Sequence, residues 1–355
     1  MADNRRRRAR ERIERVCVSS LDERSMRSAI LEEVSRVVDF DSYVWLLTDP
    51  GSTVGCAPLA DVPCLPRLPE LIRLKYLTET NRWTALIDRT SPVALLNSDL
   101  GRSRVWRELL CDFGIVDIAS LVFADRYGCW GFLDLWLAGE KRRFDATAAG
   151  LLADIAAPVC AAIRTRQAAT FLGAQPLSAP GTGPAVLILD DDLTITGRTT
   201  AATQWLRSLL PTTPGAAPIP AAAYNVAAQL LANESGVDDH PASARAFVAG
   251  CGWVTLQASR LDSASADVAG TIAVSIEETA AQSRLDLFGR SHGLSAREQE
   301  LLRLLSRGAE TRDIAGAMTI TEYTVQDHLK SIFGKTTLTS RSAVVTAALG
   351  PGATN

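Results

Sequence analysis

The sequence predicts a multidomain protein in which two α/β domains precede an all-α domain of four helices. Its 355 residues are enough for two or three domains, and 47% hydrophobic with 22% charged residues is typical of a soluble globular protein. Strand and helix periodicities alternate through the first three quarters of the chain, and helical spacing alone follows. We therefore divide the chain into an arginine-rich extension at 1–20, a first α/β domain at 21–166, a linker at 167–184, a small α/β domain at 185–280 and a helical domain at 285–350.

The extension carries a run of charge, RRRRARERIER, at residues 5–15. Such runs are usually solvated, so we expect a partly helical segment that stands in solvent. Contact with nucleic acid or with a partner helix is the alternative.

The first α/β domain is expected to hold a hairpin between helices. Its predicted elements are a helix over 21–38, a buried strand over 40–48, a proline-punctuated loop over 58–69, a helix over 70–80, strands over 115–124 and 129–137, and an alanine-rich helix over 144–166. In the second hairpin strand, alternation places Trp130, Phe132, Asp134 and Trp136 on one face.

This order of elements, with the stretch YGCWGFLDLWLAGEKRRFDATAAGLLADIAA, resembles the GAF family of sensor domains. Such domains often hold a small molecule between the sheet and the irregular middle segment, here about 51–112. The resemblance implies a ligand site for which Trp83, Trp106 and Cys111 are the candidates. The alternative is that these side chains are ordinary core. Neither cysteine nor histidine is placed for a bilin or haem, so no cofactor is expected.

Residues 175–184, QPLSAPGTGP, have the composition of a linker. Beyond them we predict strands over 185–190 and 193–196, helices over 199–210 and 221–232, and strands over 243–249, 253–260 and 271–276. The stretch VLILDDDLTITGRTTAATQWL resembles the opening of a PAS domain, which implies a small α/β sensory or spacer domain.

The acidic run LILDDD is also typical of a phospho-receiver domain. A receiver needs a phospho-accepting aspartate after a later strand and then a lysine, but no lysine lies between Lys141 and Lys330. We therefore reject the receiver and interpret Asp190, Asp191 and Asp192 as a hairpin turn.

The helical domain has local signals for each of its four helices. Ser295 and Glu298 form a capping box that begins a helix at Ala296. A second helix is expected from Thr311, a third over 322–334 and a fourth over 340–349. On the third, one stripe is predicted to be buried: Val325, Leu329, Ile332 and Phe333. The opposite face carries polar groups that can bond base edges: Tyr323, Gln326, Asp327 and Lys330.

This helix-turn-helix resembles the LuxR-type DNA-binding domain. The matching positions are Leu294, Arg297, Glu298, Glu300, Leu305, Gly308, Ile314, Ala315, Thr324, Val325, His328, Ile332, Lys335 and Arg341. The resemblance implies that the third helix enters the major groove of double-stranded DNA with Tyr323, Gln326, Asp327 and Lys330 on its base-facing side. It also implies that Thr324, Lys335 and Arg341 lie near phosphates, and that the fourth helix pairs two subunits.

Three positions depart from the family pattern. Gln326 stands where the family often has lysine, Glu310 stands where a hydroxyl usually caps the second helix, and Thr336 follows Lys335 where a glycine is common. Residues 290–349 carry eight basic against six acidic side chains, a net charge of +2. Because phosphate neutralisation supplies most non-specific affinity, a single copy should bind DNA weakly and a homodimer on paired half-sites is expected.

The sequence therefore predicts a cytoplasmic transcription regulator, gated by its front domains, with RNA polymerase as a further candidate partner. An interaction adaptor whose helix-turn-helix has lost DNA binding is the alternative. Seven cysteines without a C-x-x-C pair and only three histidines suggest no metal site. No catalytic motif is present, so no enzyme is expected. No apolar run of membrane-spanning length and no secretory signal is found.

Overall fold

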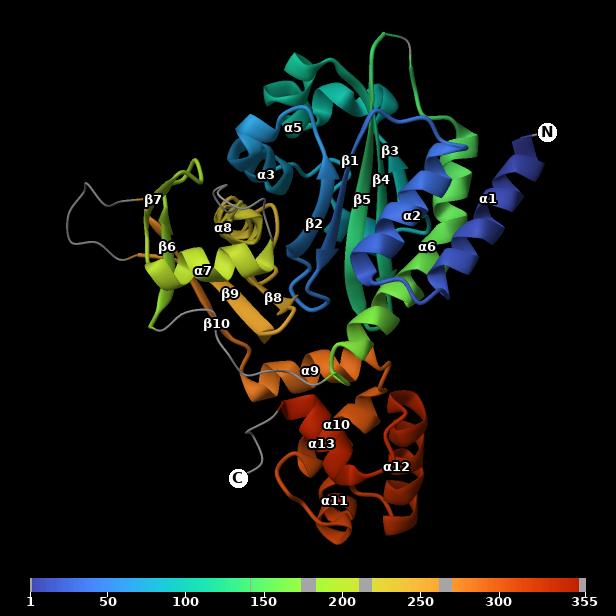
Figure 1. Cartoon of the computed structure of the whole chain (residues 1–355), viewed down its shortest axis with the longest axis vertical. Coiled ribbons are helices and arrows are strands. Elements are labelled where there is room, and N and C mark those ends of the chain that lie inside the picture. The colour runs from blue at the N-terminus through green and yellow to red at the C-terminus, as the bar shows by residue number, and fades with distance from the viewer. Residues whose placement is uncertain (1, 141, 174–182, 211–218, 262–269, 351–355) are drawn as a thin grey trace.

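The computed structural model describes residues 2–140, 142–173, 183–210, 219–261 and 270–350. In Figure 1 the first α/β domain lies at the right, the small α/β domain at the left, and the helical domain below both. Most of the predicted linker at 175–184 lies outside the described residues.

The first domain is built on a five-stranded antiparallel sheet of order β2-β1-β5-β4-β3. The strands are β1 (Ser42–Thr48), β2 (Gly55–Asp61), β3 (Val93–Leu95), β4 (Ile115–Asp125) and β5 (Gly128–Ala138). One face is covered by α1 (Ala2–Cys17), α2 (Glu23–Ser35) and α6 (Ala146–Ala169) (Figure 1). The other face carries α3 (Leu68–Tyr76), α4 (Trp83–Ile87), α5 (Arg104–Glu108) and the short 3-10 turns Leu65–Arg67, Asn97–Arg102 and Leu110–Phe113. The predicted hairpin and flanking helices are confirmed.

The segment predicted as a proline-punctuated loop begins as a strand instead. Pro58 lies within β2 and pairs with Leu46 of β1. Because β2 is the edge of the sheet, one side of it makes no ladder bonds, and a proline is tolerated there. The sequence prediction was wrong at this point because a proline alone does not distinguish an edge strand from a loop.

The predicted face of β5 is also wrong at one position. Phe123 pairs with Gly131 and Ala124 pairs with Cys129, so Trp130 is the extra residue of a β-bulge. The bulge turns Trp130, which is fully buried, toward the α6 side of the sheet. Phe132, Asp134 and Trp136 remain on the opposite face.

The arginine-rich extension is helical but it is docked on the first domain. Ala9 and Ile13 of α1 have no exposed surface and pack against α6 and α2. The arginines around this stripe reach neighbouring helices: Arg6 Nε lies 2.7 Å from a carboxylate oxygen of Asp154. The expectation of a solvated extension is corrected because every fourth position of the charge run is apolar.

Among the described helices, α6 is the one with the length and apolar composition to cross a membrane. The sequence analysis did not recognise it. Its side chains Leu151, Leu152, Ile155 and Val159 are fully buried in the first domain's core, as is usual for the central helix of a folded domain.

The small domain repeats the strand order of the first, with a sheet of order β7-β6-β10-β9-β8. Its strands are β6 (Ala185–Leu189), β7 (Ile195–Arg198), β8 (Ser243–Val248), β9 (Gly252–Arg260) and β10 (Ile272–Glu278), and its helices are α7 (Thr200–Leu209) and α8 (Ala221–Glu234). Asp190 Oδ1 accepts the N–H groups of Asp192 and Thr194, so the acidic run is a hairpin turn as predicted. β6 is antiparallel to both of its neighbours, which is incompatible with a receiver fold.

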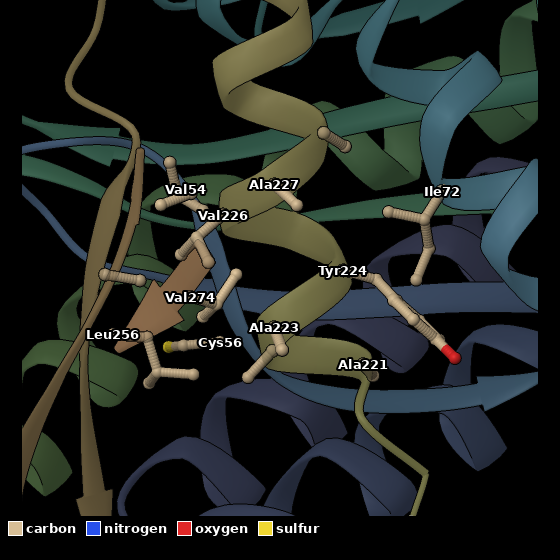
Figure 2. Close-up of a cluster of buried hydrophobic side chains, with 14 of the residues drawn as sticks. Val54, Cys56, Ile72, Ala221, Ala223, Tyr224, Val226, Ala227, Leu256 and Val274 are labelled. Atoms are coloured by element: carbon tan, nitrogen blue, oxygen red, sulfur yellow. The ribbon is translucent and has the colours of Figure 1, made fainter. Parts of the chain in front are cut away.

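Helix α8 lies between the two α/β domains and is buried on nearly all sides. Figure 2 shows Val226 facing Leu256 and Val274 of the small domain, with Val54 and Cys56 of the first domain beside them. Tyr224 and Ile72 lie toward α3 on the other side of the helix (Figure 2). A helix that is apolar all round is typical of a buried position, and here it joins the two domains into one hydrophobic core.

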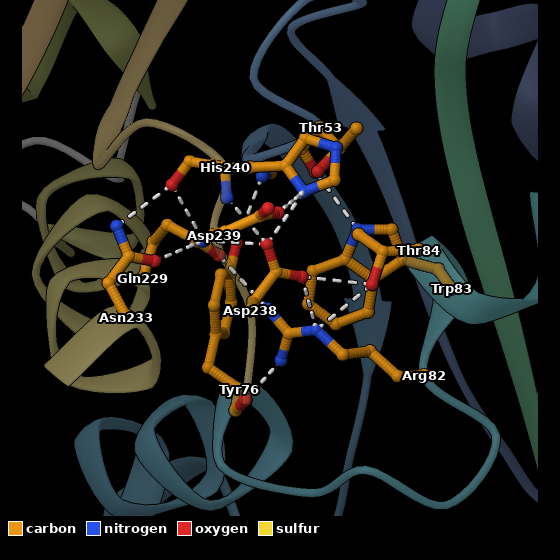
Figure 3. Close-up of polar contacts among 11 residues, drawn as sticks. Thr53, Tyr76, Arg82, Trp83, Thr84, Gln229, Asn233, Asp238, Asp239 and His240 are labelled. Atoms are coloured by element: carbon orange, nitrogen blue, oxygen red, sulfur yellow. Dashed lines mark hydrogen bonds and ion pairs between the residues drawn. The ribbon is translucent and has the colours of Figure 1, made fainter. Parts of the chain in front are cut away.

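Polar contacts reinforce this joint between the domains. Arg82, 2% exposed, donates from Nε to Asp238 at 2.8 Å and from Nη2 to Gln229 at 3.0 Å (Figure 3). His240 Nδ1 lies 2.6 Å from the other Asp238 oxygen. Burial alone would raise the pKa of Asp238, but the bonds from His240 and Arg82 lower it. Asp238, Asp239 and His240 gather possible metal ligands within 4.8 Å, yet both oxygens of Asp238 already accept these bonds.

A second buried pair connects β8 to the turn after β1. Arg245 donates from Nε and Nη2 to Asp49 at 2.6 and 2.7 Å, and its Nη1 lies 3.3 Å from Asp286. Burial would raise the pKa of Asp49, but the bonds from Arg245 lower it. Since Asp286 belongs to the next helix, this one guanidinium touches all three parts of the chain.

The helical domain comprises α10 (Ala296–Leu305), α11 (Thr311–Met318), α12 (Glu322–Thr336) and α13 (Arg341–Leu349), as predicted, and is preceded by α9 (Ala281–Ser291). The sequence analysis missed α9, which places Leu285, Leu287 and Phe288 in the core of the helical domain. Its Arg290 donates to the backbone oxygen of Tyr127, in the β4–β5 turn, at 2.9 Å. Helix α9 therefore connects the helical domain to the front of the molecule (Figure 1).

Candidate nucleic-acid interface and ligand cavity

The start of α10 is fixed by the predicted capping box. Ser295 Oγ accepts the N–H of Glu298 at 3.3 Å, and Glu298 Oε2 accepts the N–H of Ser295 at 2.6 Å. The two orphan N–H groups at this helix end are thereby satisfied.

The turn between α11 and α12 has the geometry of a helix-turn-helix. Thr319 ends α11 in the left-handed region at φ 56°. Thr321 then caps α12 by accepting the N–H of Thr324 at 3.1 Å. Glu310 stands at the N-cap of α11 without a side-chain capping bond, which is the departure noted in the sequence.

Helix α12 separates a buried stripe from an exposed face. Val325 and Ile332 are fully buried and Leu329 is 2% exposed, which confirms the predicted helical register. On the other side Tyr323 is 73% exposed, and the remaining members of the predicted base-facing group, Gln326, Asp327 and Lys330, are exposed as well. No described part of the front domains covers this face. Lys330 Nζ lies 3.5 Å from Asp327 at helical spacing, a weak pair between exposed groups.

The three residues predicted near phosphates are held by bonds within the domain. Thr324 Oγ1 is 2.9 Å from Thr321 Oγ1. Arg341 donates from Nη2 to Thr311 Oγ1 at 2.8 Å, and Lys335 donates to Glu298 Oε2 at 2.6 Å. Their positions are therefore fixed before any nucleic acid is present.

Glu298 is the central electrostatic group of the domain. It is 4% exposed and accepts from Ser331 Oγ at 2.6 Å as well as from Lys335. Burial alone would raise its pKa, but the hydrogen bonds from Lys335, Ser331 and the Ser295 backbone lower the pKa of Glu298 to about 2. The carboxylate closes the capping box and at the same time ties α12 to α10.

The predicted ligand residues do not line the cavity that the first domain contains. That cavity, of about 350 Å³, lies between the sheet, α3 and the start of α8. Trp83 is instead fully buried, stacks on Phe132 at 4.5 Å and donates to the Thr53 backbone. Trp106 donates to the backbone oxygen of Ile115, and Cys111 is half-buried. The prediction failed at these residues because aromatic side chains also serve as core.

The polar groups of the cavity wall were missed by the sequence analysis. Lys75 and Asp134 form an ion pair of 2.6 Å, and Trp136 and Asn225 lie nearby in the wall. One signal was present, since Asp134 is the only charged residue in the strand GCWGFLDLWLA. Asn225 gave none, because it belongs to the other α/β domain.

Comparison with known proteins identifies the helical domain. The family described as "Bacterial regulatory proteins, luxR family" matches residues 292–348. This segment is a LuxR-family helix-turn-helix DNA-binding domain, and such a domain implies a transcription regulator; regulators of this family are not enzymes. No curated protein matches the chain.

One solved structure is similar over most of the length. The crystal structure of Escherichia coli SdiA shares 12% identity, covering 97% of this chain and 96% of that one, at a TM-score of 0.31. A score at this level carries no argument about the front domains.

Proposed function

We propose that the protein reads specific DNA sites as a dimer, using the exposed face of α12, and that its two α/β domains are a sensory module that controls presentation of that helix. The observation that carries the proposal is the division of α12. Its apolar stripe is buried in a LuxR-family domain, while Tyr323, Gln326, Asp327 and Lys330 stand exposed together. Amide, carboxylate and ammonium groups are suited to base edges in the major groove.

Backbone contacts are assigned to the pre-positioned group. Thr324, Lys335 and Arg341 are oriented by bonds to neighbouring side chains, and contacts with phosphates fix the register of a protein on its site. Lys335 keeps two of its three N–H donors for a phosphate when Glu298 takes one.

Dimerisation follows from the charge of the domain. A net charge of +2 over residues 290–349 is too small for tight binding by one copy. Two copies on half-sites one helical turn apart would double the contacts. The fourth helix, α13, is the proposed pairing element, by resemblance to the family, and RNA polymerase is a proposed further partner at the promoter.

For the front domains we propose a GAF-like first domain and a PAS-like second domain. The support is the element order in each, together with the shared 2-1-5-4-3 order of the strands. Gating would operate through α9, whose Asp286 and Arg290 contact Arg245 of the second domain and Tyr127 of the first. A ligand or partner that prefers one arrangement of these contacts shifts the population in which two α12 helices match the half-sites.

The test is selection of bound fragments from sheared genomic DNA by the full-length protein. We expect enrichment of a two-fold-related motif. The matched control is the double variant Gln326→Ala and Lys330→Ala, which keeps the buried stripe and should lose the motif. If the wild-type chain enriches no motif, or the double variant enriches the same one, base reading by α12 is refuted.

A further inference from the structure

The cavity of the first domain has buried hydrogen-bond donors in an apolar wall. Its walls are mainly aliphatic and aromatic side chains from β1, β2, α3 and β5, closed on one side by the start of α8. A volume of about 350 Å³ falls within the range of small-molecule sites, which combine an apolar lining with a few placed polar groups.

Two of the donors in this wall have no partner among the described residues. Trp136 is 2% exposed and its Nε1–H makes no hydrogen bond; Asn225 is 1% exposed and its Nδ2 makes none. Leaving a buried donor unsatisfied is costly. Two such donors in the wall of one cavity indicate that something within the cavity accepts from them.

The charged groups of the wall are already neutralised. Lys75 Nζ lies 2.6 Å from Asp134 Oδ2, and Ser120 donates to the other Asp134 oxygen at 2.7 Å. Lys75 and Asp134 are largely buried, with side-chain exposures of 19% and 5%. A ligand with its own net charge would be buried here without a counter-charge, which is strongly unfavourable.

We propose that this cavity binds an uncharged, mainly apolar small molecule whose carbonyl-type oxygens accept hydrogen bonds from Trp136 and Asn225. Trp136 belongs to β5 of the first domain and Asn225 to α8 of the second. One molecule bonded to both would therefore hold the two domains together. That regulatory consequence rests on the proposed function, whereas the binding site itself does not.

The experiment uses the full-length protein and prodan, an uncharged naphthyl ketone whose emission responds to hydrogen bonding at its carbonyl. Saturable binding of prodan is expected, with Trp136→Phe and Asn225→Leu each weakening it roughly three- to tenfold by loss of one donor. The matched control is Trp253→Phe. Trp253 also has a buried, unpaired indole N–H, 6% exposed, but it packs with Phe171 outside the cavity.

Two readouts separate the site from a structural role. Without prodan, Trp136→Phe should melt at the wild-type temperature or higher, because it removes an unsatisfied donor. If an internal water serves that donor instead, the variant melts lower and binds prodan as the wild type does, which overturns the proposal. Absence of prodan binding, equal weakening by Trp253→Phe, or equally tight binding of the anion anilinonaphthalene sulfonate overturns it too. Any of these results with the DNA motif still enriched leaves the proposed function standing.

Discussion

Glu298→Gln should loosen the recognition helix without touching its exposed face. The carboxylate accepts Lys335 and Ser331, both on α12, at 2.6 Å each while it closes the α10 capping box. Its pKa falls from an ordinary 4.5 to about 2, and at 1.36 kcal/mol per unit this corresponds to roughly 3 kcal/mol of domain stability at neutral pH. We expect the amide to lose about 2–3 kcal/mol of it, since glutamine keeps the shape but not the charge.

The same group sets a pH dependence. Because the folded-state pKa is the lower one, the folded domain binds fewer protons than the unfolded chain between about pH 4.5 and 2. The contribution of Glu298 to stability is therefore complete above pH 4.5 and is lost as the pH falls toward 2. The Glu298→Gln variant should lack this component of acid unfolding.

Hydrogen exchange of α10 and α12 amides in the full-length chain is the assay, because a chain of several domains has no single unfolding free energy. Glu300→Gln on the same helix is the control. Glu300 pairs only with Arg297, at 2.9 Å and with both side chains well exposed, so its loss should cost less than about 0.5 kcal/mol. Equal protection in the two variants would refute the assignment of Glu298 as the tie between α10 and α12.

Three further results are expected. Val325→Asp buries an unpaired charge at a position with no exposed surface and should unfold the helical domain; a cooperative melt at the wild-type temperature would contradict the register of α12. Arg245→Met leaves Asp49 buried without its partner and should cost about 3–5 kcal/mol at the domain joint, seen as faster exchange in β8, while unchanged exchange would remove that pair from the account. Of the seven thiols, only Cys111 and Cys251 are not fully buried, so these two alone should react with a thiol reagent in the native protein at neutral pH, and rapid labelling of any third would show that the described packing is wrong.

Burial also makes the remaining thiols poor nucleophiles. It raises the pKa of Cys129 to about 11 and that of Cys56 to about 12, so the reactive thiolate is scarce at neutral pH.

The helical domain could be predicted from the sequence because its signals are local. The Ser295–Glu298 capping box and the Val325, Leu329, Ile332 stripe act within four residues of one another. The partner of Lys335 could not be predicted in this way. Glu298 lies far from it in the sequence and meets it only when α10 packs on α12.

The front domains show the same division. Strands and helices followed from periodicity, but the bulge at Trp130 depends on how β4 and β5 pair. The docking of α1 depends on α6 being present to bury Ile13. The cavity depends on α8, since Asn225 and Trp136 come from separate domains. Each of these features is a tertiary contact that no local pattern encodes.

The most direct test of base reading by α12 is the affinity of full-length protein for its selected site and for unrelated DNA, with Lys330→Ala compared with Arg307→Ala. Both positions are exposed in the helical domain and each variant removes one positive charge, but Arg307 lies outside α12. We predict that Lys330→Ala costs about 1–3 kcal/mol on the selected site and relaxes base preference, while Arg307→Ala weakens both DNAs slightly and equally. If Lys330→Ala leaves the ratio of the two affinities unchanged, the exposed face of α12 does not read bases.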